Sequence, residues 1–268
     1  MMTSTAAPLK QVLSIRWNPN KDLAVVALSW LLVVGAFYTA TAIVGQTMWG
    51  GLAYFFLYAV VGATLFGVGI PLYWMTVVRR RPIAELGLTS KRWGPSLVLQ
   101  LVFAALLYFG TLAKVQLPPV EELVPLVALA LAIGFFEAVF WRGWVLLRLE
   151  ESFGIIPAIL LGSAFYAAYH LGYAMPLSEM IFLFFIGILF AVVFRLTRNI
   201  LILWPIFQPM GQLVTLVKDQ LTLPLLAALG FAEVLMLMLV LVWLARRYHR
   251  KHSQQNEATQ HAHAAEPI

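Results

Sequence analysis

The chain has 268 residues, of which 62% are hydrophobic and 11% are charged, and its formal net charge is +6. Soluble domains are about half apolar and about a quarter charged, so this composition excludes a water-soluble globule and predicts an integral membrane protein. The sequence contains no cysteine, which excludes disulfides, thiolate metal sites and a cysteine nucleophile. In a membrane protein with short loops the positive charge first indicates orientation, so nucleic acid is not an expected partner.

Apolar runs long enough to span a bilayer alternate with turns and charge clusters along the chain. The eight runs cover residues 23–44, 51–78, 95–113, 124–149, 155–174, 176–194, 200–217 and 223–244. They predict an all-α bundle of eight transmembrane helices within residues 23–245, preceded by a polar segment over 1–22. The tail over 246–268 is charged and rich in Gln, His and Ala. We expect disorder there, with a metal-binding histidine tract as the alternative.

Basic residues fall almost entirely on one side of the eight predicted crossings. If the N-terminus is cytoplasmic, fifteen of the 18 Lys and Arg residues lie on the side of both termini, Lys114 and Lys218 lie on the other side, and Arg142 lies inside a span. Short cytoplasmic loops collect Lys and Arg, so we expect both termini in the cytoplasm. The lipid bilayer is therefore a partner, and a prokaryotic cell membrane is the simplest location for a chain without a targeting signal.

Few ionisable or strongly polar residues lie inside the predicted spans, and each ionisable group costs about 3 kcal/mol or more in hydrocarbon. Glu137 and Arg142 lie in the fourth span and His170 lies in the fifth. Gln208 and Gln212 lie four residues apart in the seventh span, so their amides share one helix face. These residues are the candidates for a functional site.

Depth in the membrane places the candidates from three spans in one layer. At 1.5 Å per residue from the cytoplasmic boundary, Glu137, His170 and Gln212 lie roughly 20, 24 and 21 Å deep, and Gln208 lies about 6 Å shallower. Polar groups at one depth on different helices can satisfy one another, so we expect them to converge. Two structural alternatives stay open: Glu137 as a protonated hydrogen-bond partner of His170, and the glutamines as partners for carbonyls freed by the flanking prolines.

The first two polar clusters resemble motifs of the CAAX-processing and bacteriocin-immunity (Abi, or CPBP) membrane proteases. That family has eight transmembrane helices and three separated motifs, of which the first is Glu-Glu-x-x-x-Arg. Glu137 and Arg142 match it, and Ala138 stands at its second glutamate. The second motif, Phe-x-x-x-His, is matched by Tyr166 and His170, with tyrosine at the aromatic position.

The third motif, His-x-x-x-Asn or Asp, falls on Gln208 and Gln212, so both of its chemical groups are changed. The resemblance covers a core of about residues 123–244 and implies an intramembrane endopeptidase acting on a membrane-associated or lipid-modified peptide. It also implies a divalent metal. Zinc hydrolysis needs three protein ligands, and only Glu137 and His170 are conventional ligands here, so a metal cofactor is disfavoured.

Hydrolysis without a metal needs a general base, a proton donor for the leaving amine and donors for the oxyanion. We expect Glu137 to activate the water. His170 would orient that water or protonate the leaving amine, and the amides of Gln208 and Gln212 would donate to the oxyanion. This assignment requires the Glu137 carboxyl and the His170 imidazole to approach within about one water molecule of each other.

Arg142 and Tyr166 are expected to be structural. Arg142 is five residues from Glu137, which places it on another face of an α-helix, where it would tie helices together or meet loop carboxylates. Tyr166 and its neighbour Tyr169 are expected to pack as aromatics. A non-catalytic family member that binds membrane proteins is the main functional alternative, because the motif residues at 138 and 208 are changed. A transporter is disfavoured, since we find no internal repeat.

Overall fold

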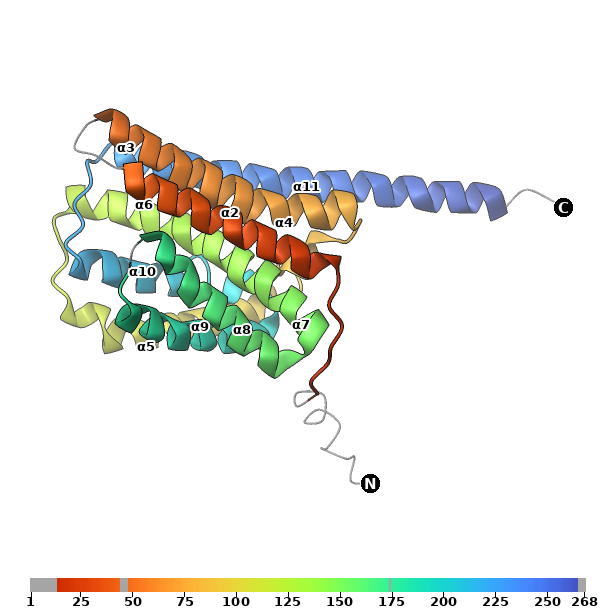
Figure 1. Ribbon diagram of the computed structural model, residues 1–268, viewed down its shortest axis with the longest axis horizontal. Helices are drawn as coiled ribbons and strands as arrows, with labels where there is room; N and C mark the ends of the chain where they lie inside the picture. The colour runs from red at the N-terminus through yellow and green to blue at the C-terminus, as the bar shows by residue number, and fades with distance from the viewer. Residues whose placement is uncertain (1–13, 44–47, 174, 265–268) are drawn as a thin grey trace, which may run out of the picture.

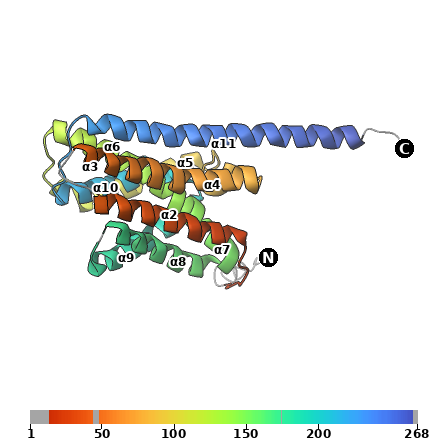
Figure 2. The same ribbon diagram turned by 45° about the horizontal axis from the view of Figure 1, so that its top comes forward.

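The computed structural model of the protein describes residues 14–43, 48–173 and 175–264, and it contains no β-strand in these ranges. Its helices run side by side in one bundle, and the start of α2 and the end of α11 lie at the same end of that bundle (Figure 1 and Figure 2). The predicted all-α class is confirmed. The elements are α2 (Lys21–Ile43), α3 (Met48–Phe55), η1 (Phe56–Gly69), α4 (Ile70–Tyr73), η2 (Trp74–Val78), η3 (Ile83–Leu86), α5 (Trp93–Gly110), η4 (Leu112–Lys114), α6 (Val120–Glu137), η5 (Ala138–Leu146), α7 (Leu147–Phe153), α8 (Ile155–Ala168), η6 (Tyr169–Tyr173), α9 (Leu177–Thr197), η7 (Ile200–Ile202), α10 (Phe207–Lys218) and α11 (Ala227–Ala264).

Seven helical stretches of the described residues are long and apolar enough to cross a membrane. They coincide with seven of the eight predicted spans, because continuous apolar runs of about 20 residues satisfy their backbone groups within one helix. These stretches are Lys21–Ile43, Gly50–Val78, Trp93–Lys114, Val120–Phe153, Ile155–Tyr173, Leu177–Thr197 and Ala227–His252.

The predicted seventh span, residues 200–217, is not one continuous helix. It consists of the turn η7, a bend with a cis Trp204–Pro205 peptide bond, and α10, which begins at Phe207 and has 12 residues. A helix of 12 residues is only about 18 Å long, shorter than the roughly 30 Å hydrocarbon core. Pro205 precedes α10, whereas Pro209 lies in its first turn, where backbone N–H groups have no helical partner. The expected count of eight membrane-length helices is therefore not reached among the described residues.

The C-terminal helix extends farther than the sequence suggested. α11 continues to Ala264 and projects beyond the other helices (Figure 1). The structure thus describes residues 246–264, for which we expected disorder, as helix. Local contacts one turn apart support this extension, such as the stacking of Tyr248 on His252 with ring centroids 4.0 Å apart.

The fourth membrane stretch, formed by α6, η5 and α7, is the most buried part of the bundle. Of its most apolar 18 residues, 67% are buried. The helices α8, α10 and α11 pack against this stretch. Its middle section changes from α-helix to π-helix at Ala138, directly after Glu137. The two candidate charged residues of this stretch therefore lie at the centre of the protein and on either side of a change in helix geometry.

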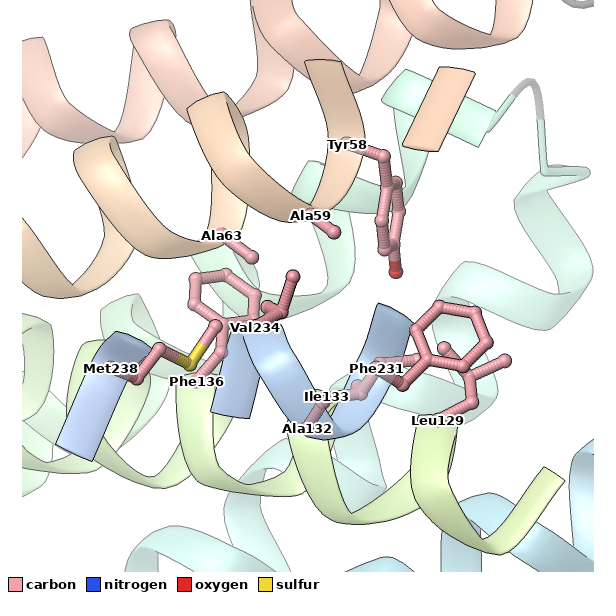
Figure 3. Close-up of a pocket in the computed structure, with 10 residues that line it drawn as sticks. All are labelled: Tyr58, Ala59, Ala63, Leu129, Ala132, Ile133, Phe136, Phe231, Val234 and Met238. Atoms are coloured by element: carbon pink, nitrogen blue, oxygen red, sulfur yellow. The ribbon is translucent and has the colours of Figure 1, made fainter. Parts of the chain in front are cut away.

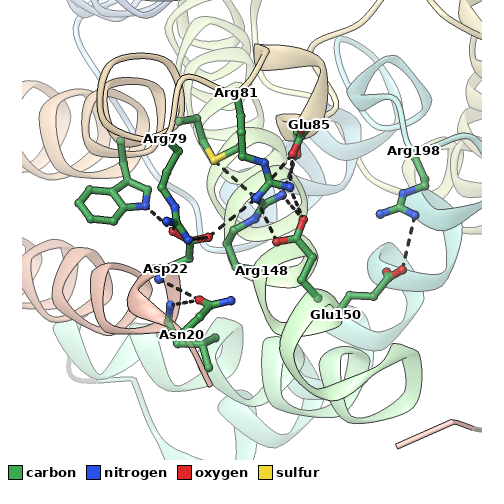
Figure 4. Close-up of polar contacts among 12 residues, drawn as sticks. Asn20, Asp22, Arg79, Arg81, Glu85, Arg148, Glu150 and Arg198 are labelled. Carbon is green, nitrogen blue, oxygen red and sulfur yellow. Dashed lines mark hydrogen bonds and ion pairs between the residues drawn. The ribbon is translucent and has the colours of Figure 1, made fainter. Parts of the chain in front are cut away.

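A network of ion pairs closes the end of the bundle at which α2 begins (Figure 4). Asp22 is 1% exposed and accepts hydrogen bonds from Trp74 Nε1 at 2.6 Å and from Arg79 at 2.7 and 3.0 Å. Its position in the first turn of α2 also places its charge at the positive end of the helix dipole. Asp22 therefore links the start of α2 to the segment that follows η2.

Further ion pairs in this network join the loop before η3 to α7. Arg81 donates to Glu151 at 2.7 and 3.2 Å, and that hydrogen bond raises the pKa of the Arg81 guanidinium above its usual value. Arg148, which is 1% exposed, lies 3.1 Å from the same carboxylate. Arg195 of α9 pairs with Glu150. The acidic residues of α7 thus form ion pairs with arginines of the loop before η3, of α7 itself and of α9, all at one end of the fourth stretch.

We expect Asp22→Asn to lower the free energy of unfolding by about 1.5–3 kcal/mol, the range for hydrogen bonds to a charged group. The amide keeps the shape but loses the charge that Arg79 requires. Because the Arg79 side chain is 35% exposed, solvent screening favours the lower half of that range. Thermal unfolding in detergent measures the effect, and Asp219→Asn in the exposed loop after α10 is the matched control. Equal stability of Asp22→Asn and wild type would contradict the structural role of this network.

Candidate active site

The Glu137 carboxylate is the centre of a buried polar cluster. Glu137 is the last residue of α6 and is 1% exposed. Its Oε2 accepts hydrogen bonds from the side-chain amides of Gln208 at 2.6 Å and Gln212 at 2.9 Å. Its Oε1 accepts a hydrogen bond from the Tyr169 hydroxyl at 2.6 Å. The predicted convergence of the fourth and seventh spans is present, and three neutral donors surround the carboxylate.

Close contact between α6 and α10 brings the two glutamines to Glu137. Gly134 lies one turn before Glu137, and a Cβ at this position would come within 2.7 Å of Pro209 Cγ. The missing side chain therefore lets α10 approach the backbone of α6, as small residues do between membrane helices. Gln208 and Gln212 lie one turn apart on α10, so their amides reach the same carboxylate oxygen.

His170 lies beside this cluster but does not hydrogen-bond to Glu137. Its Nδ1 is 3.1 Å from the Tyr166 carbonyl oxygen and 3.3 Å from that of Ala167, and the residue is 8% exposed. A carbonyl oxygen can only accept, so Nδ1 carries the hydrogen and Nε2 keeps its lone pair. The imidazole lies against the Tyr169 ring, with centroids 4.0 Å apart. Tyr169 therefore contacts both residues: its hydroxyl bonds to Glu137 and its ring packs against His170. Among the described residues, no direct hydrogen bond joins His170 to Glu137.

Tyr169 is the functional candidate that sequence reasoning missed. We expected it to pack as an aromatic, and it does pack against Trp141 and His170. Its hydroxyl, however, also donates a hydrogen bond of 2.6 Å to Oε1 of Glu137. A usable signal was present in the sequence, because a tyrosine hydroxyl buried in a membrane requires a partner, and Glu137 lies at the same predicted depth.

We expect Tyr169→Phe to reduce cleavage about tenfold or more, since a hydrogen bond to a charged group contributes about 1.5–3 kcal/mol. Initial rates on a membrane peptide substrate measure the effect. Tyr173→Phe is the matched control, because its hydroxyl bonds to the Tyr58 hydroxyl at 3.0 Å and not to Glu137. Similar rates for the two variants would show that the hydroxyl on Glu137 has no role in catalysis.

The two glutamines have different partners from those expected. Each amide donates one N–H to Glu137, and because an amide NH₂ has two N–H groups, the second N–H of each remains available for another acceptor. Among the described residues, the two side chains do not bond to backbone carbonyls freed by the prolines. Gln100 of α5 donates to the Leu201 carbonyl instead. The side-chain oxygen of Gln208 is buried and has no hydrogen-bond partner, which leaves an acceptor beside the carboxylate.

The structure places Arg142 and Tyr166 together. The Arg142 guanidinium lies over the Tyr166 ring, 5.0 Å from its centroid, and both residues are nearly completely buried. Tyr166 also packs edge-on against His170 with centroids 5.5 Å apart. Arg142 makes no ion pair with a loop carboxylate among the described residues, because Glu85, Glu150 and Glu151 pair with other arginines.

The donor set at Glu137 does not fit a three-ligand metal site. No group of three or more His, Cys, Asp or Glu side chains lies close enough to hold a metal ion in the part of the chain that the structure describes. The groups nearest to the carboxylate are amide N–H and phenol O–H donors, which serve an anionic oxygen and not a cation. The residues present are therefore suited to hydrogen bonding around a carboxylate.

A small apolar pocket lies between η1, α6 and α11 (Figure 3). Its free volume is only ≈ 10 Å³, which is room for about one water molecule. Phe136, the neighbour of Glu137, forms part of its wall, and Tyr58 connects it to Tyr173 through the hydroxyl bond. The full lining is Tyr58, Ala59, Ala63, Leu129, Ala132, Ile133, Phe136, Phe231, Val234 and Met238.

A comparison with known protein families matches part of the chain. Residues 119–207 match the family described as type II CAAX prenyl endopeptidase Rce1-like. The resemblance to the CAAX proteases is confirmed. The matched segment contains Glu137 and His170 and ends directly before Gln208, where the third motif departs from the family pattern. No individual curated protein matches the chain. The similarity to an endopeptidase family indicates a protease-type function in a membrane.

Proposed function

We propose that the protein is an intramembrane endopeptidase in which Glu137 activates water for hydrolysis of a peptide bond in a membrane-associated substrate. The observation that supports this most is the convergence of α6, α10 and η6 on one buried carboxylate. A carboxylate has about four acceptor sites. Tyr169, Gln208 and Gln212 donate to three of them and Tyr166 also interacts with the carboxylate, so the attacking water must replace one of these donors. A general base requires such a hydrogen bond to the water that it deprotonates.

The reaction follows from these groups. The water oxygen attacks the carbonyl carbon of the scissile bond while its proton moves to Glu137. The C–N bond then breaks, and the leaving nitrogen takes that proton, so that acid and amine are the products. Tyr169 stabilises the carboxylate before the attack and after its return to the charged form. His170, with a free lone pair on Nε2, orients the water from the other side of the Tyr169 ring.

The match to a family of prenyl endopeptidases supports a lipid-modified peptide as substrate. The basic residues around the ends of α2 and α11 support a cytoplasmic position for that end of the bundle. Substrate would then approach within the bilayer, with its peptide at the carboxylate.

The test is cleavage of fluorogenic peptides by the purified full chain in liposomes. Peptides with a prenylated cysteine are compared with unmodified membrane peptides of the same sequence, each with and without a chelator. We expect cleavage that persists with the chelator, prefers the prenylated peptide and falls at least about tenfold in His170→Ala. Loss of activity with the chelator would overturn the metal-free mechanism, and no cleavage of any peptide would overturn the endopeptidase.

A second candidate is a non-catalytic family member that binds membrane proteins. The specific observation in its favour is that three neutral donors already occupy Glu137 and that no hydrogen bond joins it to His170 within the described ranges. In that case the cluster would fasten α6, α10 and η6 together. The liposome assay separates the candidates, because the binding function predicts a folded protein that cleaves none of the peptides.

A further inference from the structure

Arg142 is a buried charge whose polar atoms have no hydrogen-bond partner. The residue is 1% exposed, and its Nε, Nη1 and Nη2 are all buried without an acceptor among the described residues. Aromatic rings lie beside the guanidinium, with centroids 5.0 Å away for Tyr166 and 5.8 Å away for Phe190. Cation–π contacts of this kind offset only part of the cost of burying an unpaired ion. The charge therefore needs an opposite charge nearby.

Glu137 is the carboxylate that can supply it. Of the other acidic groups of the fourth stretch, Glu150 and Glu151 pair with arginines at one end of the bundle, and Glu121 and Glu122 lie exposed in the first turn of α6. Asp22 and Glu137 are the buried acidic residues among those described, and Asp22 already pairs with Arg79. No hydrogen bond joins Arg142 to Glu137. Each residue completes what the other lacks, since the donors around Glu137 are all neutral and Arg142 has no anionic partner in the described ranges.

The π-helix η5 brings the positions of these two residues closer to one face of the helix. In an α-helix, residues three or four apart share a face, and residues five apart do not. A π-helix has i→i+5 hydrogen bonds, so residues five apart approach the same face. Glu137 directly precedes η5 and Arg142 is its fifth residue. The wider helix therefore turns the guanidinium toward the side of Glu137, which the α-helical expectation did not predict.

We propose that Arg142 is the counter-charge of Glu137 and acts as a positioning residue that keeps the carboxylate ionised inside the membrane. The pair has no net charge, so the protein avoids burying either ion alone. This role deepens the proposed function, and the test of it by cleavage activity rests on that function. The test by thermal unfolding does not depend on it.

The other groups that face Glu137 do not compete for this role. α10 contributes amides, which carry no charge, and η6 and α8 contribute phenols and an imidazole whose Nδ1 bonds to backbone carbonyls. Five elements contribute groups that contact Glu137 or interact with it electrostatically. These groups are Gln208 and Gln212 of α10, Tyr169 and Tyr173 of η6, Tyr166 of α8, Tyr58 of η1 and Arg142 of η5. Arg142 is the one cation among them.

A double-variant cycle of the full chain in detergent tests the pairing by thermal unfolding. Glu137→Gln removes the negative charge, Arg142→Met removes the positive charge, and the double variant removes both. We expect each single variant to melt several degrees below wild type. The double variant should melt clearly above the temperature that adding the two losses gives, because it buries no unpaired ion. Additive losses would overturn the proposal.

Arg148→Met is the matched control for removing a buried arginine. Arg148 is also 1% exposed, but its carboxylate partner is Glu151 at 3.1 Å. Combined with Glu137→Gln, it should give additive losses. If Arg142→Met alone does not fold, the double variant decides: a folded Glu137→Gln/Arg142→Met protein supports the pairing, and an unfolded one overturns it.

The activity arm uses the pH dependence of cleavage, which a purely structural role would not move. In Arg142→Lys the charge remains, so the acidic limb of the pH–rate profile should stay close to that of wild type. In Arg142→Met the limb should move to higher pH, because loss of the positive charge disfavours the ionised carboxylate. An unmoved limb in a folded, active Arg142→Met protein would overturn the role in catalysis. If wild type cleaves nothing, only the proposed function fails, and the unfolding cycle still decides the pairing.

Discussion

Glu137→Gln is expected to reduce peptide cleavage by about 10²–10⁴-fold, the usual contribution of a general base. The glutamine has nearly the same shape, and its side-chain oxygen can still accept from the amides of Gln208 and Gln212. Its NH₂ group, however, cannot take a proton from water. Initial rates in liposomes measure the loss, with circular dichroism to show that the helical content is unchanged.

The matched control for this variant is Glu179→Gln, in the exposed first turn of α9. It removes one carboxylate of the same type at a distance from the cluster, so its rate should equal that of wild type. If Glu137→Gln retains more than a tenth of the wild-type rate while folded, Glu137 is not the base. The structural alternative, in which the carboxylate only connects helices, would then account better for its burial.

Gly143→Ala should lower the free energy of unfolding by about 1–3 kcal/mol, although alanine is intrinsically the better helix former. A Cβ at Gly143 would overlap the Leu86 carbonyl oxygen and come within 3.0 Å of the Leu86 carbonyl carbon. Because these are backbone atoms of η3 and not the end of a flexible side chain, the contact can be relieved only by moving η3 away from η5. Thermal unfolding in detergent measures the loss.

Gly35→Ala is the matched control within a membrane helix. Gly35 lies in the interior of α2, and a Cβ there would meet no atom within 4 Å. The same substitution should therefore leave stability unchanged or raise it by up to about 1 kcal/mol. A similar loss in both variants would mean that the effect at Gly143 arises from helix propensity or lipid contact, and not from close packing of η3 on η5.

The membrane helices were predictable because their signal is local. A run of about 20 apolar residues must satisfy its own backbone in lipid, and this requirement fixed seven stretches from composition alone. The segment over 200–217 is similarly apolar but contains Pro205. A proline disfavours the helical conformation at the residue before it, which here is Trp204. The break after η7 depends on tertiary contacts such as that of Gln100 with Leu201, which composition does not indicate.

The sequence predicted which residues form the polar cluster better than it predicted which of them contact one another. Depth counting placed Glu137 with Gln208 and Gln212, and they are hydrogen-bonded. It did not indicate that Tyr169 would lie between Glu137 and His170, because α8 ends in the 3₁₀ turn η6, whose side-chain directions differ from those of the predicted α-helix. The facing of Arg142 likewise depended on a π-helix, which residue spacing alone does not reveal.

The close approach at Gly134 has a consequence for the evolution of this sequence. Because the space for a side chain at 134 is filled by the Pro209 ring, neither position can change size without displacing α10, and with it the amides on Glu137. The two positions are distant in the chain yet share one volume. Among related sequences we therefore expect residues at 134 and 209 to vary as a pair, with a larger residue at one compensated by a smaller residue at the other.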